Sequence, residues 1–400
     1  MTRTILISGA GIAGPALAAS LARAGNRVTV VERAPALRTG GSAVDFRGEV
    51  HLEVLRRTGL LEPLRAQQTG GSPWSFVDDA GHELATLPAS YAGGAIEVRR
   101  GDLSRTLAAA ADGVEYLFGD SITALRDGPH GVEVGLASGV ERVVDLVIGA
   151  DGLHSAVRRL AFGPEERFVR HFGYRVAGWD LPNTLGADRT TVLHSVPGRT
   201  AALTADPHDP GTARALFVHA ATGDLPRDRP ARLDELREAY AGVGWWVPEL
   251  LATLDAATDV YVDAIARVRL PRWSQGRIVL LGDAGYGATL GGMGAGTAVV
   301  GAYVLAAELA ATPDHAVAFA RYEDRLRRYV TRCQRGAAGA GKFLAPRTAA
   351  GIALRTRIFR SSPGRKLLLG QADSQAAAVE LPEVARDTSG IGESSGPPAR

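Results

Sequence analysis

Largely apolar runs that end at glycine are the most regular feature of this chain. Residues 5–7 are Ile-Leu-Ile, and three glycines spaced Gly-x-Gly-x-x-Gly follow at Gly9, Gly11 and Gly14. An alanine-rich stretch separates them from a second apolar run at residues 28–31. Such runs indicate strands buried on both faces of a parallel sheet, and the alanine-rich stretch indicates a helix. The pattern therefore predicts a strand–helix–strand unit at the beginning of the chain.

The buried-strand pattern returns twice, at residues 143–148 and 277–281. The first run leads through Asp151 into a helical segment, and the second leads through Asp283 toward a glycine-rich turn at residues 291–296 that opens another helix. In open α/β sheets, ligands bind outside the carboxyl ends of the strands. We therefore expect both aspartates to lie beside a ligand, with Asp283 accepting a hydrogen bond from a sugar hydroxyl.

Two other stretches change to short alternating segments with Gly, Pro and Asp between them, at residues 70–94 and 172–268. This alternation is typical of antiparallel strands, and residues 233–254 interrupt it with a mainly helical pattern. A β-meander is expected over residues 114–136. Near the end, residues 349–369 are expected to be helical.

Composition narrows the classes of protein that this chain represents. Four hundred residues exceed what one core usually serves, so we expect two globular domains. The formal net charge is only +2 with acids and bases interspersed, which argues against a nucleic-acid partner. Cys333 is the single cysteine, so no internal disulfide forms. We expect no secretory signal, and no membrane-spanning segment, because no uninterrupted apolar run is long enough. No metal-binding or Ser/His/Asp constellation stands out.

The first glycine loop carries the clearest chemistry. Gly9 permits a tight turn, Gly11 lets the backbone approach a pyrophosphate, and Gly14 lets the helix pack closely on the strand. The N–H groups at the start of that helix attract an anion. Glu32 ends the second strand, about 20 residues further on, where a dinucleotide site places an acid on the ribose hydroxyls. Strand, glycines, helix and acid together predict nucleotide binding, and Arg47 is a candidate partner for a phosphate.

A second glycine-rich stretch mimics a phosphate-binding loop. Residues 336–342 have the spacing of a P-loop that ends in Lys342, but Phe343 occupies the place of the Ser or Thr that would hold magnesium. The preceding residues, 322–335, have a helical pattern where the motif needs a strand. We therefore expect no nucleoside triphosphate at this stretch.

These pieces, in this order, resemble the class A flavin-dependent monooxygenases, the p-hydroxybenzoate hydroxylase-like family that includes aromatic polyketide hydroxylases and tetracycline-inactivating enzymes. The similarity covers about residues 3–345. The opening loop with Glu32 matches the part that holds the ADP half of FAD. Asp151-Gly152, with Ser155 and Arg158, matches the D-G-x-x-S-x-x-R pattern that the family uses for FAD and NADPH.

The third match is Gly282-Asp283, where the family's aspartate contacts the ribityl part of FAD, followed by Gly292-Met293-Gly294 beside the flavin ring. Arg100 lies in an Arg-Gly-Asp-Leu segment that usually contacts FAD, and Arg47 lies in the mobile-flavin loop region. The cofactor-binding residues that the resemblance implies are Gly9, Ala10, Gly11, Ile12, Ala13, Gly14, Glu32, Arg33, Arg47, Arg100, Ile122, Asp151, Gly152, Gly282, Asp283, Gly292, Met293 and Gly294.

The resemblance implies an α/β fold: a Rossmann-like FAD-binding domain, a discontinuous antiparallel-sheet substrate domain and C-terminal helices. The expected division is residues 1–70, 95–170 and 270–345 for the FAD-binding domain, 71–94 and 171–269 for the substrate-binding domain, 346–380 for a C-terminal helical region, and 381–400 for a disordered tail. The candidates for the substrate pocket are Trp179, His194, His219, Tyr286 and Leu290.

The chain departs from the family pattern beside the expected flavin ring. Tyr286 stands where relatives often have histidine, and no proline precedes the glycine turn near residues 289–291. The departure lies where the reactive edge of the flavin meets the substrate, so it bears on the shape of the pocket and on whether oxygen is transferred.

The expected activity is hydroxylation of an aromatic or polycyclic small molecule, in a biosynthetic or a resistance role. In the family that the chain resembles, NADPH or NADH reduces the flavin, O₂ adds at C4a, and the hydroperoxide delivers one oxygen atom. No catalytic side chain is assigned, because the cofactor does the chemistry. The alternatives are an FAD-dependent oxidase or dehydrogenase and a non-catalytic flavin-binding protein. Halogenation is disfavoured, because no lysine precedes Lys342 and residues 245–248 lack the Trp-x-Trp-x-Ile-Pro pattern. We expect a cytoplasmic monomer or homodimer without a membrane or nucleic-acid partner.

Overall fold

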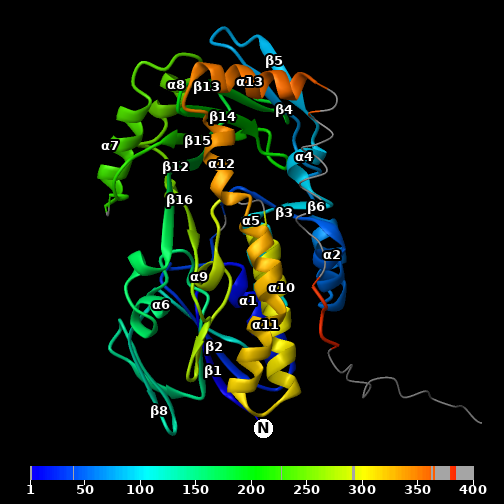
Figure 1. Ribbon diagram of the computed structural model, residues 1–400, viewed down its shortest axis with the longest axis vertical. Helices are drawn as coiled ribbons and strands as arrows, with labels where there is room; N and C mark the ends of the chain where they lie inside the picture. Colours follow the sequence, from blue (N-terminus) through cyan, green and yellow to red (C-terminus); the bar gives the residue numbers. More distant parts are fainter. Residues whose placement is uncertain are drawn as a thin grey trace, which may run out of the picture.

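The computed structural model describes residues 2–38, 40–226, 228–290, 293–361, 364 and 379–383. Two large sheets dominate it, one in each half of the molecule, with long helices beside the first and shorter helices around the second (Figure 1). The predicted fold class, an α/β fold with a second, largely antiparallel sheet, is confirmed.

The first sheet has six strands, and its neighbours are parallel except for the terminal β17–β18 pair. In spatial order the strands are β17 (Ser274–Gln275), β18 (Ile278–Leu280), β11 (Leu146–Gly149), β1 (Thr4–Ser8), β2 (Arg27–Glu32) and β7 (Glu115–Phe118). The strand–helix–strand unit expected at the start of the chain is β1, α1 (Ala13–Arg23) and β2. Parallel pairing sends the carboxyl ends of β1, β2, β11 and β18 to one edge of the sheet.

The second sheet has seven strands that come from two separate stretches of sequence. In spatial order they are β16 (Tyr261–Val268), β12 (Val169–Pro182), β15 (Thr212–Ala220), β14 (Arg199–Ala205), β13 (Thr191–Val196), β4 (Trp74–Val77) and β5 (Glu83–Leu87). Their neighbours are antiparallel except for β13 and β4, which run parallel where the two stretches meet. The boundaries of the domains in sequence stay a prediction.

Two small sheets and the remaining helices complete the chain. The small sheets are β10 (Glu141–Val144), β9 (Gly131–Leu136) and β8 (Ile122–Gly128), and β3 (Ala43–Phe46) with β6 (Ile96–Arg99). The other helices are α2 (Gly48–Arg57), α3 (Leu61–Arg65), α4 (Ser90–Gly93), α5 (Arg100–Ala109), α6 (Ala156–Ala161), the 3-10 helix η1 (Glu165–Arg167), α7 (Arg229–Ala239), α8 (Val247–Ala252), α9 (Asp283–Tyr286), α10 (Gly294–Ala311), α11 (His315–Cys333), α12 (Ala337–Leu344) and α13 (Ala349–Arg360).

Two strand predictions were wrong in detail. The expected meander over residues 114–136 is divided, because β7 joins β2 in the parallel sheet while β8 and β9 pair with β10. The run at residues 143–148 is also two strands, which separate at Asp145. The Asp145 carboxylate accepts hydrogen bonds of 2.7 Å from both the amide and the hydroxyl of Thr4, and this fixes the start of β11 beside β1.

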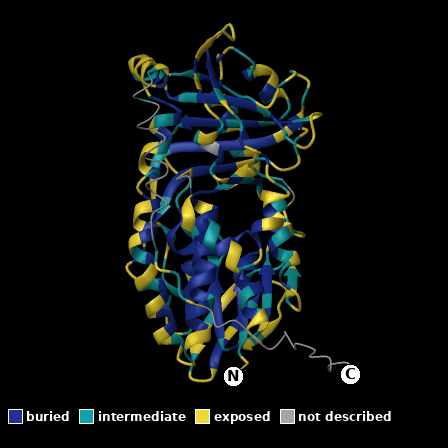
Figure 2. Cartoon of the chain, turned by 90° about the vertical axis from the view of Figure 1, so that its right-hand side faces the viewer, coloured by how far each residue is buried: buried dark blue, intermediate teal, exposed yellow. Residues whose placement is uncertain are grey.

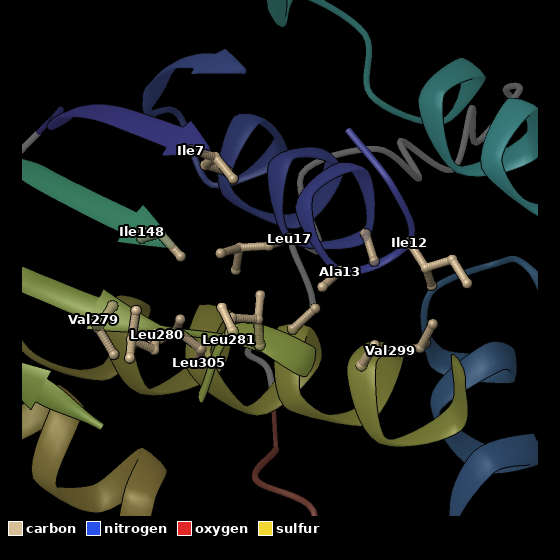
Figure 3. Packing of buried hydrophobic residues seen from close by; sticks show 14 of the residues in the cluster. Ile7, Ile12, Ala13, Leu17, Ile148, Val279, Leu280, Leu281, Val299 and Leu305 are labelled. Carbon is tan, nitrogen blue, oxygen red and sulfur yellow. The ribbon is translucent and has the colours of Figure 1, made fainter. Parts of the chain in front are cut away.

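The main core lies between the six-stranded sheet and the helices α1 and α10. Figure 3 shows side chains of these two helices and of three parallel strands meeting in one cluster, with Leu17, Ile148, Leu281 and Leu305 among them. Each of these four side chains is almost completely buried. In Figure 2 the buried residues fill the interior of this half and follow the strands of the other sheet.

Among the helices of the described ranges, α10 is the one that is long and apolar enough, by length and composition, to span a membrane. No membrane-spanning segment was expected from the sequence. Most of α10 is buried, it packs on α1 and α11, and its Glu308 forms an ion pair with Arg325 of α11. A helix that is covered on all sides is apolar all round, so its composition here is that of a core helix.

The C-terminal prediction is tested only in part. Helix α13 lies within the expected C-terminal helical region, and residues 379–383 lie against the first half of the molecule, where Pro382 accepts a hydrogen bond from the hydroxyl of Tyr303 (2.8 Å). Most of the expected disordered tail, residues 384–400, is outside the described residues.

Candidate functional site

The glycine loops of three parallel strands are joined at one edge of the six-stranded sheet. The amide of Gly9 donates to the carbonyl of Val31 (2.7 Å), the amide of Ala150 donates to Ser8 (2.8 Å), and the amide of Leu281 donates to Gly149 (2.8 Å). The loops after β1, β11 and β18 therefore form one continuous rim, with the end of β2 beside them.

Each glycine of the first loop has a different environment. Gly9 has φ +106°, and a Cβ there would lie 2.4 Å from the carbonyl oxygen of Ala150; a Cβ on Gly14 would lie 1.9 Å from the carbonyl oxygen of Gly9. By contrast, a Cβ on Gly11 would meet nothing within 4 Å. Packing within the protein therefore explains Gly9 and Gly14, while Gly11 leaves open space above its backbone. That space fits a ligand that approaches the main chain closely.

Glu32 stands at the end of β2 and turns its carboxylate across the glycine loop. One carboxylate oxygen accepts from the amide of Ala10 (2.7 Å) and the other accepts from the amide of Ala34 (2.8 Å). Among the other loop positions, Ile12 and Ala13 are buried and Arg33 is exposed. The acid thus occupies the expected end of the strand, and these bonds fix its orientation.

The second motif folds back on itself around the start of α6. Asp151 accepts from the hydroxyl of Ser155 and from the amides of Ala156 (2.8 Å) and Val157 (3.1 Å). Ser155 is the N-cap and accepts from the amide of Arg158 (2.9 Å). The carboxylate therefore stabilises the N-terminus of a helix in this structure, and the neighbouring Gly152 adopts φ +83°.

Arg158 carries this motif to the third loop. Its guanidinium is completely buried and donates to the carbonyls of Leu153 (2.6 Å) and Ala284 (2.9 Å) and to Glu165 (3.0 Å). Ala284 is the neighbour of Asp283. The D-G-x-x-S-x-x-R residues thus determine where the loop after β18 lies.

Asp283 lines a hollow. Its side chain is accessible to solvent, yet desolvation by the surrounding protein raises its pKa, against the opposing field of Arg100 and with a further increase from Asp263. A group that is both accessible and desolvated lies in a recess and not on the outer surface. The exposed Arg100, at the start of α5, is the cation that acts on it, and Gly282 before it needs its φ of +62° to turn the chain.

The turn before α10 is open in the same way as Gly11. A Cβ on Gly294 would meet nothing within 4 Å, and no side chain caps the N-terminus of α10. Met293 is buried beneath this turn, and Leu290 is exposed with φ +55°. Gly292 lies outside the described residues. The described part of the turn therefore presents free main chain at the same rim.

Arg47 is nearly buried at the end of β3 and forms an ion pair with Asp45. One of its guanidinium nitrogens donates to the carbonyl of Tyr91 (2.9 Å), and its amide donates to the imidazole of His51 (3.0 Å). Ile122 is buried in β8, away from any open surface. The structure thus ties Arg47 firmly into the protein.

Four of the five candidates for the substrate pocket are buried, although His194 also lines an open cavity between β13 and α13. Trp179 and His219 lie on the face of the seven-stranded sheet that α7 and α8 cover, where the indole donates to Thr253 (2.8 Å) and His219 packs on Tyr240. His194 stacks on Trp245. Tyr286 is buried and accepts from the hydroxyl of Tyr322 (3.0 Å). Leu290 is the candidate with an exposed side chain.

Sequence reasoning missed three polar residues near Asp283, namely His154, Tyr261 and Asp263. Asp263 raises the pKa values of both Asp283 and Tyr261, and His154 hydrogen-bonds to Asp263 (3.1 Å). The available signals were the place of His154 inside the D-G-x-x-S-x-x-R motif and the spacing of Tyr261 and Asp263, which puts both on one face of a strand.

Known proteins match the chain over almost its whole length. The FAD binding domain family matches residues 2–340. A flavin-dependent monooxygenase from an unknown prokaryotic organism is 34% identical over 390 residues, which cover 96% of this chain and 99% of the relative. An uncharacterized protein of Mycobacterium tuberculosis is 41% identical over 342 residues, 83% of this chain and 92% of the relative.

Among solved structures, that of the tetracycline destructase Tet(55) superimposes with a TM-score of 0.83 and is 34% identical, covering 96% of this chain and 99% of that chain. The open cradle over Gly11, the free turn at Gly294 and the recessed Asp283 fit the cofactor that this similarity implies. The chain belongs to the FAD-binding-domain family and is an FAD-dependent class A monooxygenase.

Proposed function

We propose that this monooxygenase hydroxylates a polycyclic aromatic small molecule of the tetracycline type. The observation that carries this substrate class is a cluster of three half-buried rings, Trp74, Tyr91 and Phe343. The ring centroids of Trp74 and Tyr91 are 5.7 Å apart, and those of Tyr91 and Phe343 are 6.1 Å apart. Partly exposed aromatic faces bind flat, apolar ligands.

The position of this cluster relative to the proposed cofactor residues supports the same conclusion. Arg47 donates to the carbonyl of Tyr91, so the rings adjoin the loop that is proposed to contact FAD. In the seven-stranded sheet, Arg214 of β15 forms an ion pair with Asp180 of β12 (2.6 Å) and donates a hydrogen bond to the hydroxyl of Ser42 (3.2 Å). The loop before β3 therefore reaches the face of the seven-stranded sheet that lies opposite to Trp179. The substrate would lie between this loop and that face of the sheet.

The proposed cofactor contacts come from the rim of the six-stranded sheet. The loop from Gly9 to Gly14 and the start of α1 would hold the pyrophosphate, and Glu32 would accept from the ribose hydroxyls. Asp283 would accept from the ribityl chain, and the turn at Met293 and Gly294 would offer its amides to the ring. The remaining proposed contacts are Ala10, Ile12, Ala13, Arg33, Arg47, Arg100, Ile122, Asp151, Gly152, Gly282 and Gly292.

When bound and reduced by NAD(P)H, FAD would activate O₂, and one oxygen atom of O₂ would enter the substrate. The protein's own contribution is position and exclusion of water. The aromatic cluster would orient the substrate, and the contact of Ser42 with Arg214 would close the loop over it. Desolvation raises the pKa of the Tyr91 hydroxyl to about 12, so this phenol stays protonated near neutral pH and keeps a hydrogen-bond donor at the edge of the cluster.

The test combines isotope labelling with a matched pair of variants. FAD-loaded protein is mixed with NADPH, ¹⁸O₂ and tetracycline, and the molecular mass of the product is measured by mass spectrometry. We expect one ¹⁸O atom in the product and substrate-dependent NADPH oxidation. An oxidised product without label would support the oxidase or dehydrogenase alternative, and protein that stays colourless after addition of FAD would contradict the cofactor proposal.

The variants test the location of the substrate. Trp74→Ala removes a ring from the cluster, and we expect KM for the substrate to rise about tenfold. Trp246→Ala is the control. Trp246 is also half-buried, but it packs against the hydrophobic core between the seven-stranded sheet and the helices α7 and α8. Equal effects of the two variants would contradict the proposed binding face.

The partners, the cellular location and the oligomeric state of the protein are also proposals. The balanced charge supports a protein that works without a nucleic-acid partner, and we also propose that it works without a membrane partner, in the cytoplasm, as a monomer or homodimer. Light scattering after size-exclusion chromatography would distinguish one copy from two.

A further inference from the structure

His154 links the two halves of the molecule. It follows β11 of the six-stranded sheet; its Nδ1 is 2.9 Å from Glu165 in η1, and its Nε2 is 3.1 Å from Asp263 on β16 of the seven-stranded sheet. Asp263 is almost completely buried, whereas the His154 side chain is about half exposed. Only an imidazolium donates from both ring nitrogens at once, so this arrangement requires the charged form of the histidine.

The Glu165 side of the link leads to the proposed cofactor rim. The second carboxylate oxygen of Glu165 accepts from the buried Arg158 (3.0 Å), and Arg158 donates to the carbonyl of Ala284 (2.9 Å). Ala284 adjoins Asp283. A continuous series of charged hydrogen bonds thus connects His154 to the loop after β18.

The Asp263 side of the link leads to the hollow itself. Its second carboxylate oxygen accepts weakly from the hydroxyl of Tyr261 (3.4 Å), and Tyr261 is partly exposed. The charges of Asp283 and Arg100 both act on Tyr261, so its hydroxyl lies within electrostatic range of Asp283. The linked residues therefore run from Tyr261 on β16 to Ala284, the neighbour of Asp283.

We propose that His154 is a positioning residue whose imidazolium, held between Glu165 and Asp263, fixes β16 against the loop after β18. It thereby sets the distance between Tyr261, on the substrate side, and Asp283, on the cofactor side. Its effect on turnover rests on the proposed function, whereas its effect on the protein's own mobility does not.

The charge on His154 makes this positioning dependent on pH. Hydrogen bonds to Asp263 and Glu165 raise the pKa of His154 to about 9, so the link is intact at neutral pH and one of its two bonds is lost above about pH 9. The other charged or titratable groups around the link are Arg100, Asp151, Arg158, Arg159, His171, Tyr261 and Asp283. Arginine does not titrate in this range, and burial raises the pKa of Tyr261 out of it.

Three variants of the full chain separate the proposed positioning effect of His154 from a general loss of stability. His154→Gln donates to only one carboxylate and imitates the neutral imidazole. His154→Arg keeps a cation with donors on both sides, and its charge does not titrate. His82→Gln is the matched control, because His82 also pairs with an aspartate (Asp78, 3.2 Å) but lies exposed on the turn between β4 and β5.

The first readout is amide hydrogen exchange of the FAD-free protein, which involves no turnover. In His154→Gln we expect exchange about tenfold faster than wild type both in residues 151–158 and in residues 261–264. His154→Arg and His82→Gln should keep wild-type rates in these segments. Wild-type protection of both segments in His154→Gln would overturn the proposal.

The second readout is the pH profile of kcat/KM with tetracycline. We expect a wild-type decline near pH 9 that is absent in His154→Arg, while His154→Gln is about 10- to 100-fold slower at pH 7.5, as is typical when reacting groups are misplaced. A decline that persists unchanged in His154→Arg would overturn the role of the charge. If wild type does not act on tetracycline while the exchange results hold, the substrate proposal fails and the positioning proposal stands.

Discussion

The guanidinium of Arg158 donates to the main-chain carbonyl of Ala284, 2.9 Å away and 126 residues later in the chain. This bond joins α6, which follows β11, to α9, which follows β18, so the second and third sequence motifs form one unit. Because Arg158 also holds Glu165, its removal would leave a half-buried carboxylate without its arginine and a carbonyl without its donor.

We expect Arg158→Ala to lower the free energy of unfolding by about 3 kcal/mol, since it breaks a buried ion pair and empties a buried volume. Urea unfolding of the FAD-free protein measures this. Arg159→Ala is the control, because Arg159 is the exposed neighbour in the same helix and should change stability by less than about 0.5 kcal/mol. Similar losses for both variants would show that the Ala284 bond contributes nothing particular.

The first glycine loop predicts opposite outcomes for two alanine substitutions. Gly14→Ala places a methyl group 1.9 Å from the carbonyl oxygen of Gly9, so we expect a loss of about 3 kcal/mol in stability. Gly11→Ala meets no protein atom and should leave the stability of the FAD-free protein unchanged, but weaken FAD binding at least tenfold. Thermal unfolding and titration with FAD, followed by flavin fluorescence, distinguish the two. If Gly11→Ala bound FAD as tightly as wild type, the proposal that the pyrophosphate lies over Gly11 would be wrong.

His51 predicts a loss of stability in mild acid. Its imidazole is buried, its Nδ1 accepts from Arg47 and its Nε2 is 2.6 Å from the hydroxyl of Tyr329; burial, with a smaller effect of the Arg47 charge, lowers the pKa of His51 to about 4. The unfolded chain binds this proton near pH 6.5, so the stabilisation is present above pH 6.5 and is lost as the pH falls toward 4, by about 3 kcal/mol. Denaturant titrations from pH 7 to 4 should show this extra slope in wild type and not in His51→Gln.

Leu290 combines exposure with an unfavourable backbone conformation. A branched residue at φ +55° costs about 1 kcal/mol, whereas asparagine tolerates this region. We expect Leu290→Asn to raise the stability of the FAD-free protein by up to about 1 kcal/mol and to raise KM for the substrate. The conclusion that Leu290 serves the pocket would fail if the variant were more stable and bound the substrate equally well.

The apparent P-loop at residues 336–342 is explained by helix packing. These residues belong to α12, where a Cβ on Gly341 would lie 2.4 Å from the ring of Tyr174 and a Cβ on Gly339 would meet nothing. We expect Gly341→Ala to lose about 2 kcal/mol of stability and Gly339→Ala to gain up to about 1 kcal/mol. Calorimetric titration of the protein with ATP and magnesium should show no binding at this segment.

The sequence alone determined the nucleotide-binding half of this protein in some detail. Largely apolar runs identified β1, β2 and β18, the glycine spacing identified the rim, and the ordered motifs identified the family. These features are local or depend on a fixed order, because one strand followed by one turn and one helix determines where their own residues lie. The same reasoning gave the fold class but treated the run at residues 143–148 as one strand, whereas the contact of Asp145 with Thr4 lies where β10 ends and β11 begins.

Tertiary structure alone decided which side chains face the recess. Trp179 and His219 were equally good candidates in sequence, but alternation along β12 and β15 turns them to the face that α7 and α8 cover. Trp74 and Phe343 meet through Tyr91, and His154 meets Asp263, although each pair is separated by more than a hundred residues. Pairing across strands and between the two halves of the molecule sets these contacts. No periodicity or motif within one segment carries that information.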